Sequence, residues 1–210
     1  MSAVQTLRAD ARAIFDAALD AVAAGPAVRR ALEARPIEGN PFVVAVGKAA
    51  SGMAQAAREA GADRGLIITG FASARPRPGF EVLVGDHPEP GAGSLAGGGA
   101  VESAFATHRD LLLLVSGGAS AMVCAPAEGL TLDDIVHTTR LLMRDGVDIH
   151  ALNTVRRHMS RIKGGQALRD GQRVRALLLS DVVGDDPSVI GSGLAAPDRT
   201  TYSDALAVLI

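Results

Sequence analysis

Short aliphatic runs recur along this chain and alternate with longer segments whose apolar residues follow helical spacing. A short apolar run without polar alternation is typical of a strand that is buried on both faces, as in a parallel sheet. Four runs fit this description and a fifth fits more weakly: residues 42–46, 66–68, 111–115, 176–179 and, as the weaker one, 81–84. Strands that alternate with helices favour an α/β fold. We therefore predict a three-layer, Rossmann-like sandwich with a mostly parallel sheet.

The segments between these runs predict helices over residues 4–23, 27–34, 51–60, 93–108, 131–144 and 148–161. Gly25-Pro26 is expected to end the first of them. Thr131 and Asp134 have the spacing of a capping box at the start of another.

The last segment resembles a helix start at 201–204 and then stops at the apolar Ile210 without a cap. Natural chain ends are usually polar and frayed. We therefore expect residues 1–210 to form one N-terminal α/β domain of a longer protein, with a C-terminal domain absent from this chain. The exposed apolar end would then favour self-association.

Composition excludes several functional classes. Lys and Arg number 21 against 23 Asp and Glu, so the net charge of −2 gives no bulk attraction to nucleic acid or an anionic membrane. Five Phe, one Tyr and no Trp argue against a base-stacking platform. The apolar runs are too short to cross a bilayer, and the N-terminus lacks the features of a targeting peptide. The single Cys124 fits a reducing compartment, so we expect a soluble cytoplasmic protein.

Loops rich in Gly, Ser and Asp follow the predicted strands directly. They span residues 47–52, 85–91, 116–120 and 180–187. In an open parallel sheet, ligands bind beyond the carboxyl ends of the strands. All four loops would lie on that one rim, and this coincidence predicts a site more strongly than any single loop does.

Within these loops, Lys48 would place an ammonium group at the start of a helix. The 116–120 loop offers successive backbone N–H groups and two hydroxyls, which suit an anion. Asp181, Asp185 and Asp186 could hold Mg²⁺. Each feature also has a structural interpretation that stays open: glycines often only let the chain turn, a lysine is often a solvated surface residue, and Asp185 with Asp186 could start a turn.

A basic cluster lies near the end of the 148–161 segment and comprises Arg156, Arg157, His158, Arg161 and Lys163. Adjacent helical residues point about 100° apart, so Arg156 and Arg157 are not expected to face one ligand. For most of the cluster we expect a solvated helix face, favoured by the helix dipole. Four histidines show no metal-ligand spacing and are expected to be structural or surface residues: His87, His108, His137 and His150.

Other nucleotide-binding and hydrolase motifs are absent. The chain has no P-loop motif G-x-x-x-x-G-K-[ST] and no G-x-S-x-G elbow. Its G-x-G, from Gly91 to Gly93, follows a proline-rich loop rather than a strand, which argues against a dinucleotide fingerprint.

Five ordered segments resemble the signature segments of the glycerate 2-kinase family with a C-terminal MOFRL-type domain, whose bacterial members are often labelled hydroxypyruvate reductase. They are residues 44–53, 85–91, 115–121, 153–165 and 179–187, so the resemblance covers nearly the whole chain. It implies ATP-dependent phosphorylation of D-glycerate to 2-phosphoglycerate with Mg²⁺, in a cleft between two domains.

The resemblance also implies roles for individual residues. Lys48 would be catalytic, in a reaction that depends on positioning and charge neutralisation. Asp181 and Asp186 match the aspartates to which the metal is assigned. The phosphate or substrate contacts would be Ser116, Gly117, Gly118, Ser120, Asn153 and Arg156.

The chain departs from the family pattern at a few positions. Ala119 replaces a third glycine, Val183 and Leu194 stand where prolines are common, and Ala151 replaces a frequent acidic residue. Two other functions stay open: an NAD(P)-dependent hydroxypyruvate reductase, and a non-catalytic module that binds a sugar acid or nucleotide. A homodimer also stays open.

Overall fold

The computed structural model describes residues 2–210 and contains one five-stranded parallel sheet. Its strands lie in the order β3-β2-β1-β4-β5, and every neighbouring pair is parallel. The strands are β1 (Phe42–Val46), β2 (Gly65–Thr69), β3 (Phe80–Val84), β4 (Asp110–Ser116) and β5 (Arg173–Leu179). All five apolar runs are therefore strands, and the predicted α/β fold class is confirmed.

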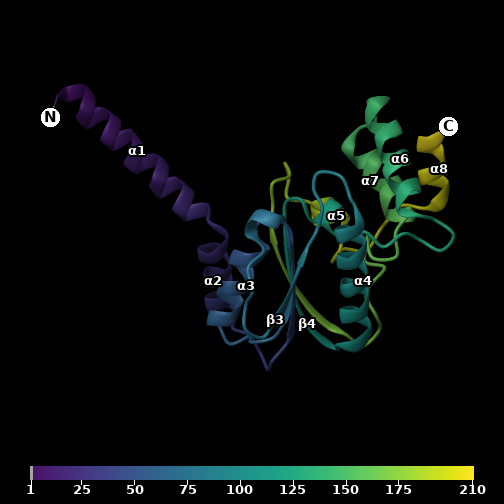
Figure 1. Cartoon of the computed structure of the whole chain (residues 1–210), viewed down its shortest axis with the longest axis horizontal. Helices are drawn as coiled ribbons and strands as arrows, with labels where there is room; N and C mark the ends of the chain where they lie inside the picture. The colour runs from purple at the N-terminus through teal and green to yellow at the C-terminus, as the bar shows by residue number, and fades with distance from the viewer. Residues whose placement is uncertain (1) are drawn as a thin grey trace.

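Helices cover both faces of this sheet (Figure 1). Successive strand residues point to opposite faces. In β1, Val43 and Ala45 pack with α2 (Ala24–Ala34) and α3 (Ala50–Glu59). Val44 and Val46 pack on the other side, with α4 (Ala92–Thr107) and the short α5 (Ala119–Met122). The sheet is thus the middle layer of three, as the sequence predicts.

The strand order reverses between β1 and β4. After β1 the chain builds outward through β2 and β3, and it then returns through α4 to place β4 on the other side of β1. In such sheets the loops at the carboxyl ends diverge at the reversal point and leave a crevice for ligands. The loops after β1 and β4 therefore lie at the expected position of that crevice.

Three further helices form a small cluster beyond one end of α4 (Figure 1). They are α6 (Leu132–Arg144), α7 (Ile149–His158) and α8 (Tyr202–Leu209), and they share a core that includes Leu142, Leu152, Val155 and Ala205. Thr131 and Asp134 form the predicted capping box at the start of α6, and Thr201 and Asp204 form another at α8. A 3₁₀ turn, η2 (Ile190–Ser192), lies on the path from β5 to α8, and η1 (Phe71–Ser73) follows β2.

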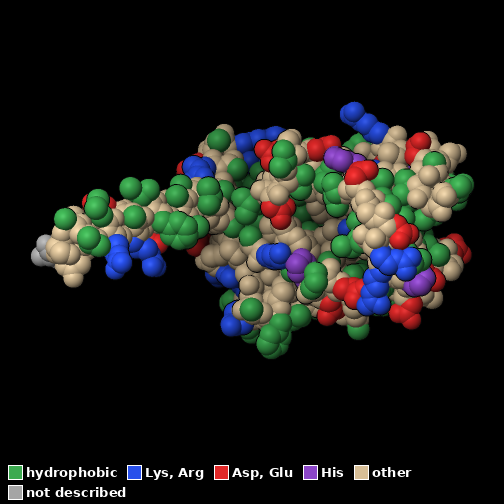
Figure 2. Space-filling view, turned by 90° about the horizontal axis from the view of Figure 1, so that it is seen from above, with side chains coloured by type: hydrophobic (Ala, Val, Ile, Leu, Met, Phe, Trp, Pro, Cys, Tyr) green, Lys and Arg blue, Asp and Glu red, His purple; other side chains and the backbone are tan. Residues whose placement is uncertain are grey.

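The first helix, α1 (Ala3–Val22), extends away from the sheet and buries none of its side chains (Figure 1). Hydrophobic side chains are exposed along this extension (Figure 2). Among residues 2–210, no helix combines the length and apolarity that crossing a membrane requires.

Two helix boundaries differ from the prediction. Gly25-Pro26 does not terminate α1, because α1 ends at Val22 and α2 begins at Ala24. Pro26 lies in the first turn of α2, where its missing N–H has no helical acceptor to lose. At the other boundary, α7 ends at His158 rather than at residue 161, so Arg161 and Lys163 lie in the loop that follows.

The consecutive glycines inside α4 are explained by close packing. A Cβ added at Gly98 would collide with the backbone of Cys124, and one at Gly97 would lie 3.0 Å from the carbonyl oxygen of Met122. These glycines let α4 approach the segment after β4, which fixes the position of α5.

Candidate active site at the carboxyl ends of the strands

The loops after β1 and β4 are bonded to each other. The backbone N–H of Lys48 donates to the carbonyl of Gly117 at 2.9 Å, and that of Ala49 donates to Ser116 Oγ at 3.0 Å. Gly47 has φ 121°, and a Cβ there would collide with Ser116. Glycine at position 47 is therefore required for this close approach. The Lys48 side chain itself is exposed at the rim.

Lys48 and His87 both lie against Gly118. A Cβ added at Gly118 would lie 3.3 Å from Lys48 Cε and 3.0 Å from His87 Cδ2. Gly118 has φ 84°, so the turn before α5 uses a left-handed conformation that favours glycine. Partial burial of the ring, and then the positive charge of Lys48, lower the pKa of His87.

His87 is thus a site residue that the sequence prediction assigned to structure or surface. Its lack of metal-ligand spacing is a correct observation, but metal binding is only one use of a histidine. The available signal was its place in the 85–91 loop, which follows β3 on the same rim.

The loop after β5 reaches the site through Asp181. A Cβ on Gly117 would collide with the Asp181 carboxylate, so a glycine here lets that carboxylate lie against the backbone of the 116–120 loop. Asp181 is exposed, as Lys48 is. The structure therefore brings together Lys48, Gly117, Gly118 and Asp181 from the predicted set.

Asp186 has a different environment. Its carboxylate accepts a hydrogen bond from the backbone N–H of Ser188 at 2.8 Å, and hydrogen bonding to Ser188 lowers its pKa. It borders a separate hollow of about 310 Å³ that is also lined by Arg157 and Asp198. Among residues 2–210, no group of three or more His, Cys, Asp or Glu side chains is arranged to hold a metal ion.

The two serines of the 116–120 loop differ in role. Ser116 is buried, and its hydroxyl holds the loop after β1 rather than facing the crevice. Ser120 Oγ lies 2.6 Å from Ser192 Oγ, and Ser192 donates to Asn153 Oδ1 at 2.9 Å. Asn153 is buried and thus connects to the loop through Ser192 instead of bordering the open rim.

Arg156 and Lys163 converge on one carbonyl group. Arg156 Nη2 donates to the carbonyl oxygen of Ser120 at 3.2 Å, and Lys163 Nζ donates to the same oxygen at 2.8 Å. Lys163 also donates to the Val123 carbonyl at 3.2 Å. Burial, and then the charge of Arg156, lower the pKa of Lys163 from its ordinary 10.5 to about 7.

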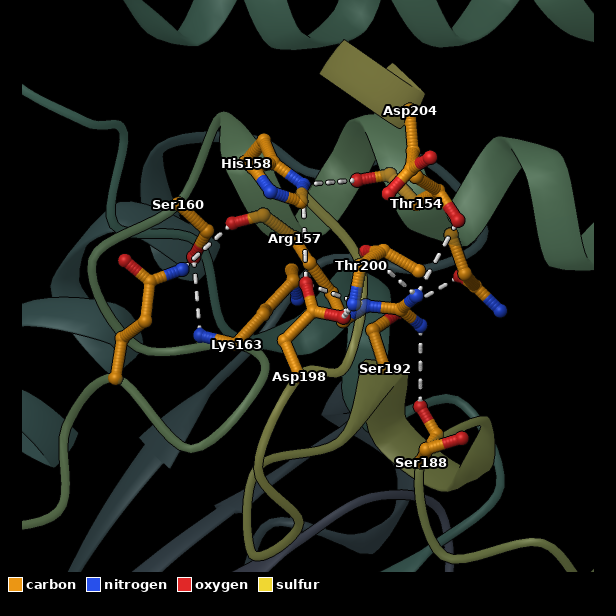
Figure 3. Close-up of polar contacts among 12 residues, drawn as sticks. Thr154, Arg157, His158, Ser160, Lys163, Ser188, Ser192, Asp198, Thr200 and Asp204 are labelled. Atoms are coloured by element: carbon orange, nitrogen blue, oxygen red, sulfur yellow. Dashed lines mark hydrogen bonds and ion pairs between the residues drawn. The ribbon is translucent and has the colours of Figure 1, made fainter. Parts of the chain in front are cut away.

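Arg157 forms a second network, with Thr154 of α7 and with the segment before α8 (Figure 3). Its Nε lies 3.0 Å from Asp198 Oδ2, and its Nη2 donates to Thr154 and Thr200 hydroxyls. These bonds hold the segment before α8 against α7. Arg156 and Arg157 do face different partners, as their spacing predicts. The predicted solvated face is wrong for Arg157 and Lys163, because both are buried.

This chain is similar in sequence and in fold to known proteins. Residues 10–210 match the model of a family described as "Domain of unknown function (DUF4147)". The chain is 36% identical over 179 residues to a "Glycerate 2-kinase" of Pyrococcus horikoshii. The aligned region covers 82% of this chain and 40% of that protein. It is also 37% identical over 209 residues to a "Putative hydroxypyruvate reductase" of Agrobacterium vitis. That aligned region covers 94% of this chain and 47% of the relative.

A crystal structure of glycerate kinase from Thermotoga maritima matches the fold with a TM-score of 0.91 at 36% identity. The match covers 98% of this chain and 51% of the Thermotoga chain. This chain therefore spans about half the length of the curated relatives that it matches.

Proposed function

This chain belongs to the DUF4147 family, and from that premise we propose that it is the phosphate-handling half of a glycerate 2-kinase. The reaction would transfer the γ-phosphoryl group of ATP to D-glycerate and give 2-phosphoglycerate. One observation carries the proposal: Lys48, His87 and Asp181 meet around Gly117 and Gly118 at the reversal point of the sheet. The glycerate 2-kinases of Pyrococcus horikoshii and Thermotoga maritima, which are 36% and 38% identical to this chain, support the same reaction.

Phosphoryl transfer depends chiefly on positioning and on neutralising the charge of the transferring group. The Lys48 ammonium is exposed at the rim and stabilises that charge. The 117–120 turn contributes backbone N–H groups, because the first-turn N–H groups of α5 have no acceptor within the helix. The bonds between the β1 and β4 loops fix these two elements relative to each other before any ligand arrives.

His87 is placed to take the proton of the attacking glycerate hydroxyl. Its lowered pKa keeps the imidazole neutral near pH 7, which is the form that accepts a proton. Its contact with the same glycine as Lys48 puts base and cation on one side of the crevice.

Asp181 suits the Mg²⁺ ion that accompanies ATP. Mg²⁺ is usually held by one or two carboxylates together with substrate phosphates, so it needs no larger cluster of acidic side chains. When bound, the ion would neutralise charge on the phosphate oxygens. Asp186, which bonds to Ser188, is the weaker of the two candidates.

We propose that the remaining wall of the cleft comes from a second domain, because the matched relatives are about twice as long. Such a domain would close over the open rim and exclude water from the transferring phosphoryl group. A homodimer and a cytoplasmic location remain predictions.

A direct assay separates the kinase from a reductase, which the name of the Agrobacterium relative favours. ADP release would be measured with ATP and D-glycerate, and NADH oxidation with hydroxypyruvate, on the full-length protein. We expect ADP release that depends on D-glycerate and no NADH oxidation, because the loop after β1 carries Lys48 instead of a dinucleotide fingerprint. NADH oxidation without ADP release would replace the kinase by the reductase, and the absence of both would favour a binding module.

A further inference from the structure

Lys163 is a buried lysine without an anionic partner among the described residues. Only 3% of its surface is exposed, and its ammonium contacts the carbonyl oxygens of Ser120 and Val123. Among residues 2–210 it forms no ion pair with a carboxylate. The charged or titratable groups that influence it are Arg156, from α7, and Cys124, from the segment after α5. A lysine is rarely buried in this way unless it is paired.

Such a residue is costly to the fold. Moving an ammonium out of water is unfavourable, and a second cation beside it adds repulsion. Replacing buried charged groups by hydrophobic side chains of similar volume is often neutral or stabilising. The unfavourable burial of Lys163 therefore indicates a role at the position that Lys163 and Arg156 both bind, which is the Ser120 carbonyl.

The hydrogen bonds of Lys163 are accepted by carbonyl groups in α5 and directly after it, and α5 follows the turn at the proposed site. Ser120 lies in the first turn of α5 and Val123 directly follows its last residue, so the bonds from Lys163 to their two carbonyls tie down both ends of this short helix. The Gly117 carbonyl of the same turn accepts the backbone N–H of Lys48. A rotation of this turn would consequently displace Lys48 as well as the backbone N–H groups.

We propose that Lys163 is a positioning residue for phosphoryl transfer, which holds the 117–120 turn and, through it, Lys48 in the reactive arrangement. This inference rests on the proposed kinase function. Lys163 acts through the Ser120 and Val123 carbonyls and does not itself contact the substrate. Arg156 supports the same turn from α7.

The burial of Lys163 predicts an unusual dependence of stability on pH. Between pH 7 and pH 10.5 the unfolded chain keeps the Lys163 proton that the folded chain has lost. The unfolded state then binds more protons, so the free energy of unfolding rises as pH increases through this window. Below pH 7 both states are protonated, and the full cost of burying the charge remains.

The test compares Lys163→Met, which removes the charge at similar volume, with Lys163→Arg, which retains it. Arg161→Met is the matched control, because Arg161 lies two residues away in the same loop and binds Glu102 at the surface. We expect Lys163→Met to melt at or above the wild-type temperature at pH 7. Its free energy of unfolding should not show the rise between pH 7 and pH 10 that is expected of the wild type. A small displacement of reacting groups can lower rates about 100-fold, so kcat should fall by about that factor, with KM changed less than about threefold. Lys163→Arg should recover part of the loss.

Amide resonances of Gly117 and Gly118 provide a readout that needs no activity. They should shift in Lys163→Met and stay in place in Arg161→Met. Unshifted amides, or a kcat within about threefold of the wild type, would overturn the inference, since about 100-fold is expected. A destabilised Lys163→Met would make the residue an ordinary structural brace and would also overturn it. If Lys163→Arg does not fold, the kcat and the amide resonances of Lys163→Met still test the inference. A wild-type protein that releases no ADP with D-glycerate contradicts the proposed function instead.

Discussion

The loops that follow β4 and β5 both carry predicted site residues, but they have opposite environments. In the 116–120 loop, Ser116 and Ala119 are buried, and backbone and side-chain bonds reach it from the loop after β1, from α7 and from the loop after α7. In the 180–187 loop, Val183 is fully exposed, and a Cβ on Gly184 would meet no atom within 4 Å. The first loop is held in place by the rest of the fold, whereas the second is held mainly by its own turn.

This difference separates two kinds of contribution to a site. Groups that stabilise developing charge must be fixed before the reaction, because reorganisation during the reaction would forfeit their effect. The 116–120 loop and the backbone at Lys48 meet that requirement. A carboxylate that binds an ion together with its nucleotide can lie on a loop with few contacts. We propose that Asp181, which is exposed on such a loop, is a carboxylate of this kind.

The largest expected effect is that of Lys48→Ala in the full-length protein. Losing one preorganised electrostatic partner lowers turnover by about 100-fold or more. The melting temperature should barely change, because exposed side chains away from packing features usually contribute within about 0.5 kcal/mol. Steady-state kinetics and thermal unfolding would be measured together, with the exposed Arg144→Ala on α6 as the control. Unchanged turnover in Lys48→Ala would remove the catalytic role of this residue.

A pair of glycine substitutions sharpens the comparison between the loops. Gly118 has φ 84° and Gly184 has φ 87°, so Ala at either position introduces similar backbone strain of about 1–3 kcal/mol. Only at position 118 does the added Cβ meet His87 and Lys48. We therefore expect similar losses of stability but a fall in kcat of about tenfold or more only for Gly118→Ala, because the reacting groups are displaced there. Equal losses of activity would show that the two loops do not differ as proposed.

The smallest expected effect separates the two aspartates of the β5 loop. Asp181→Asn should raise the Mg²⁺ concentration required for half-maximal activity, because this carboxylate lies beside the 116–120 loop. Asp186→Asn should leave that concentration nearly unchanged, because Asp186 serves the turn at Ser188. Titration of activity with Mg²⁺ at fixed ATP would measure both. A larger shift for Asp186→Asn would reverse the assignment of the metal ligand.

The strands and their rim could be predicted from sequence for a local reason. Each buried strand is a continuous apolar run, and each capping box needs only residues three positions apart. The adjacency of Lys48 and the 116–120 loop followed from the general rule on strand ends. The predicted termination of the first helix at Gly25-Pro26 was wrong because a proline also fits the first turn of the next helix.

The roles of Arg157, Lys163 and His87 could not be predicted in the same way. Arg157 is buried because the segment that carries Asp198 and Thr200 folds back on α7, about 40 residues along the chain. Lys163 is buried because α7 ends at His158, which redirects the following loop toward α5. His87 meets Lys48 only through the order of β1 and β3 in the sheet. All three depend on contacts between distant segments rather than on local pattern.

The central claim is that the crevice between the β1 and β4 loops binds the phosphate groups of the substrate. His87 reports on it directly, because its pKa is lowered by partial burial and by the charge of Lys48. We predict that an NMR titration of the His87 ring will show its pKa rise when ADP is added, since a bound phosphate opposes the field of Lys48. A His87 pKa that stays unchanged while ADP binding is saturated would place the nucleotide phosphates elsewhere and contradict the account.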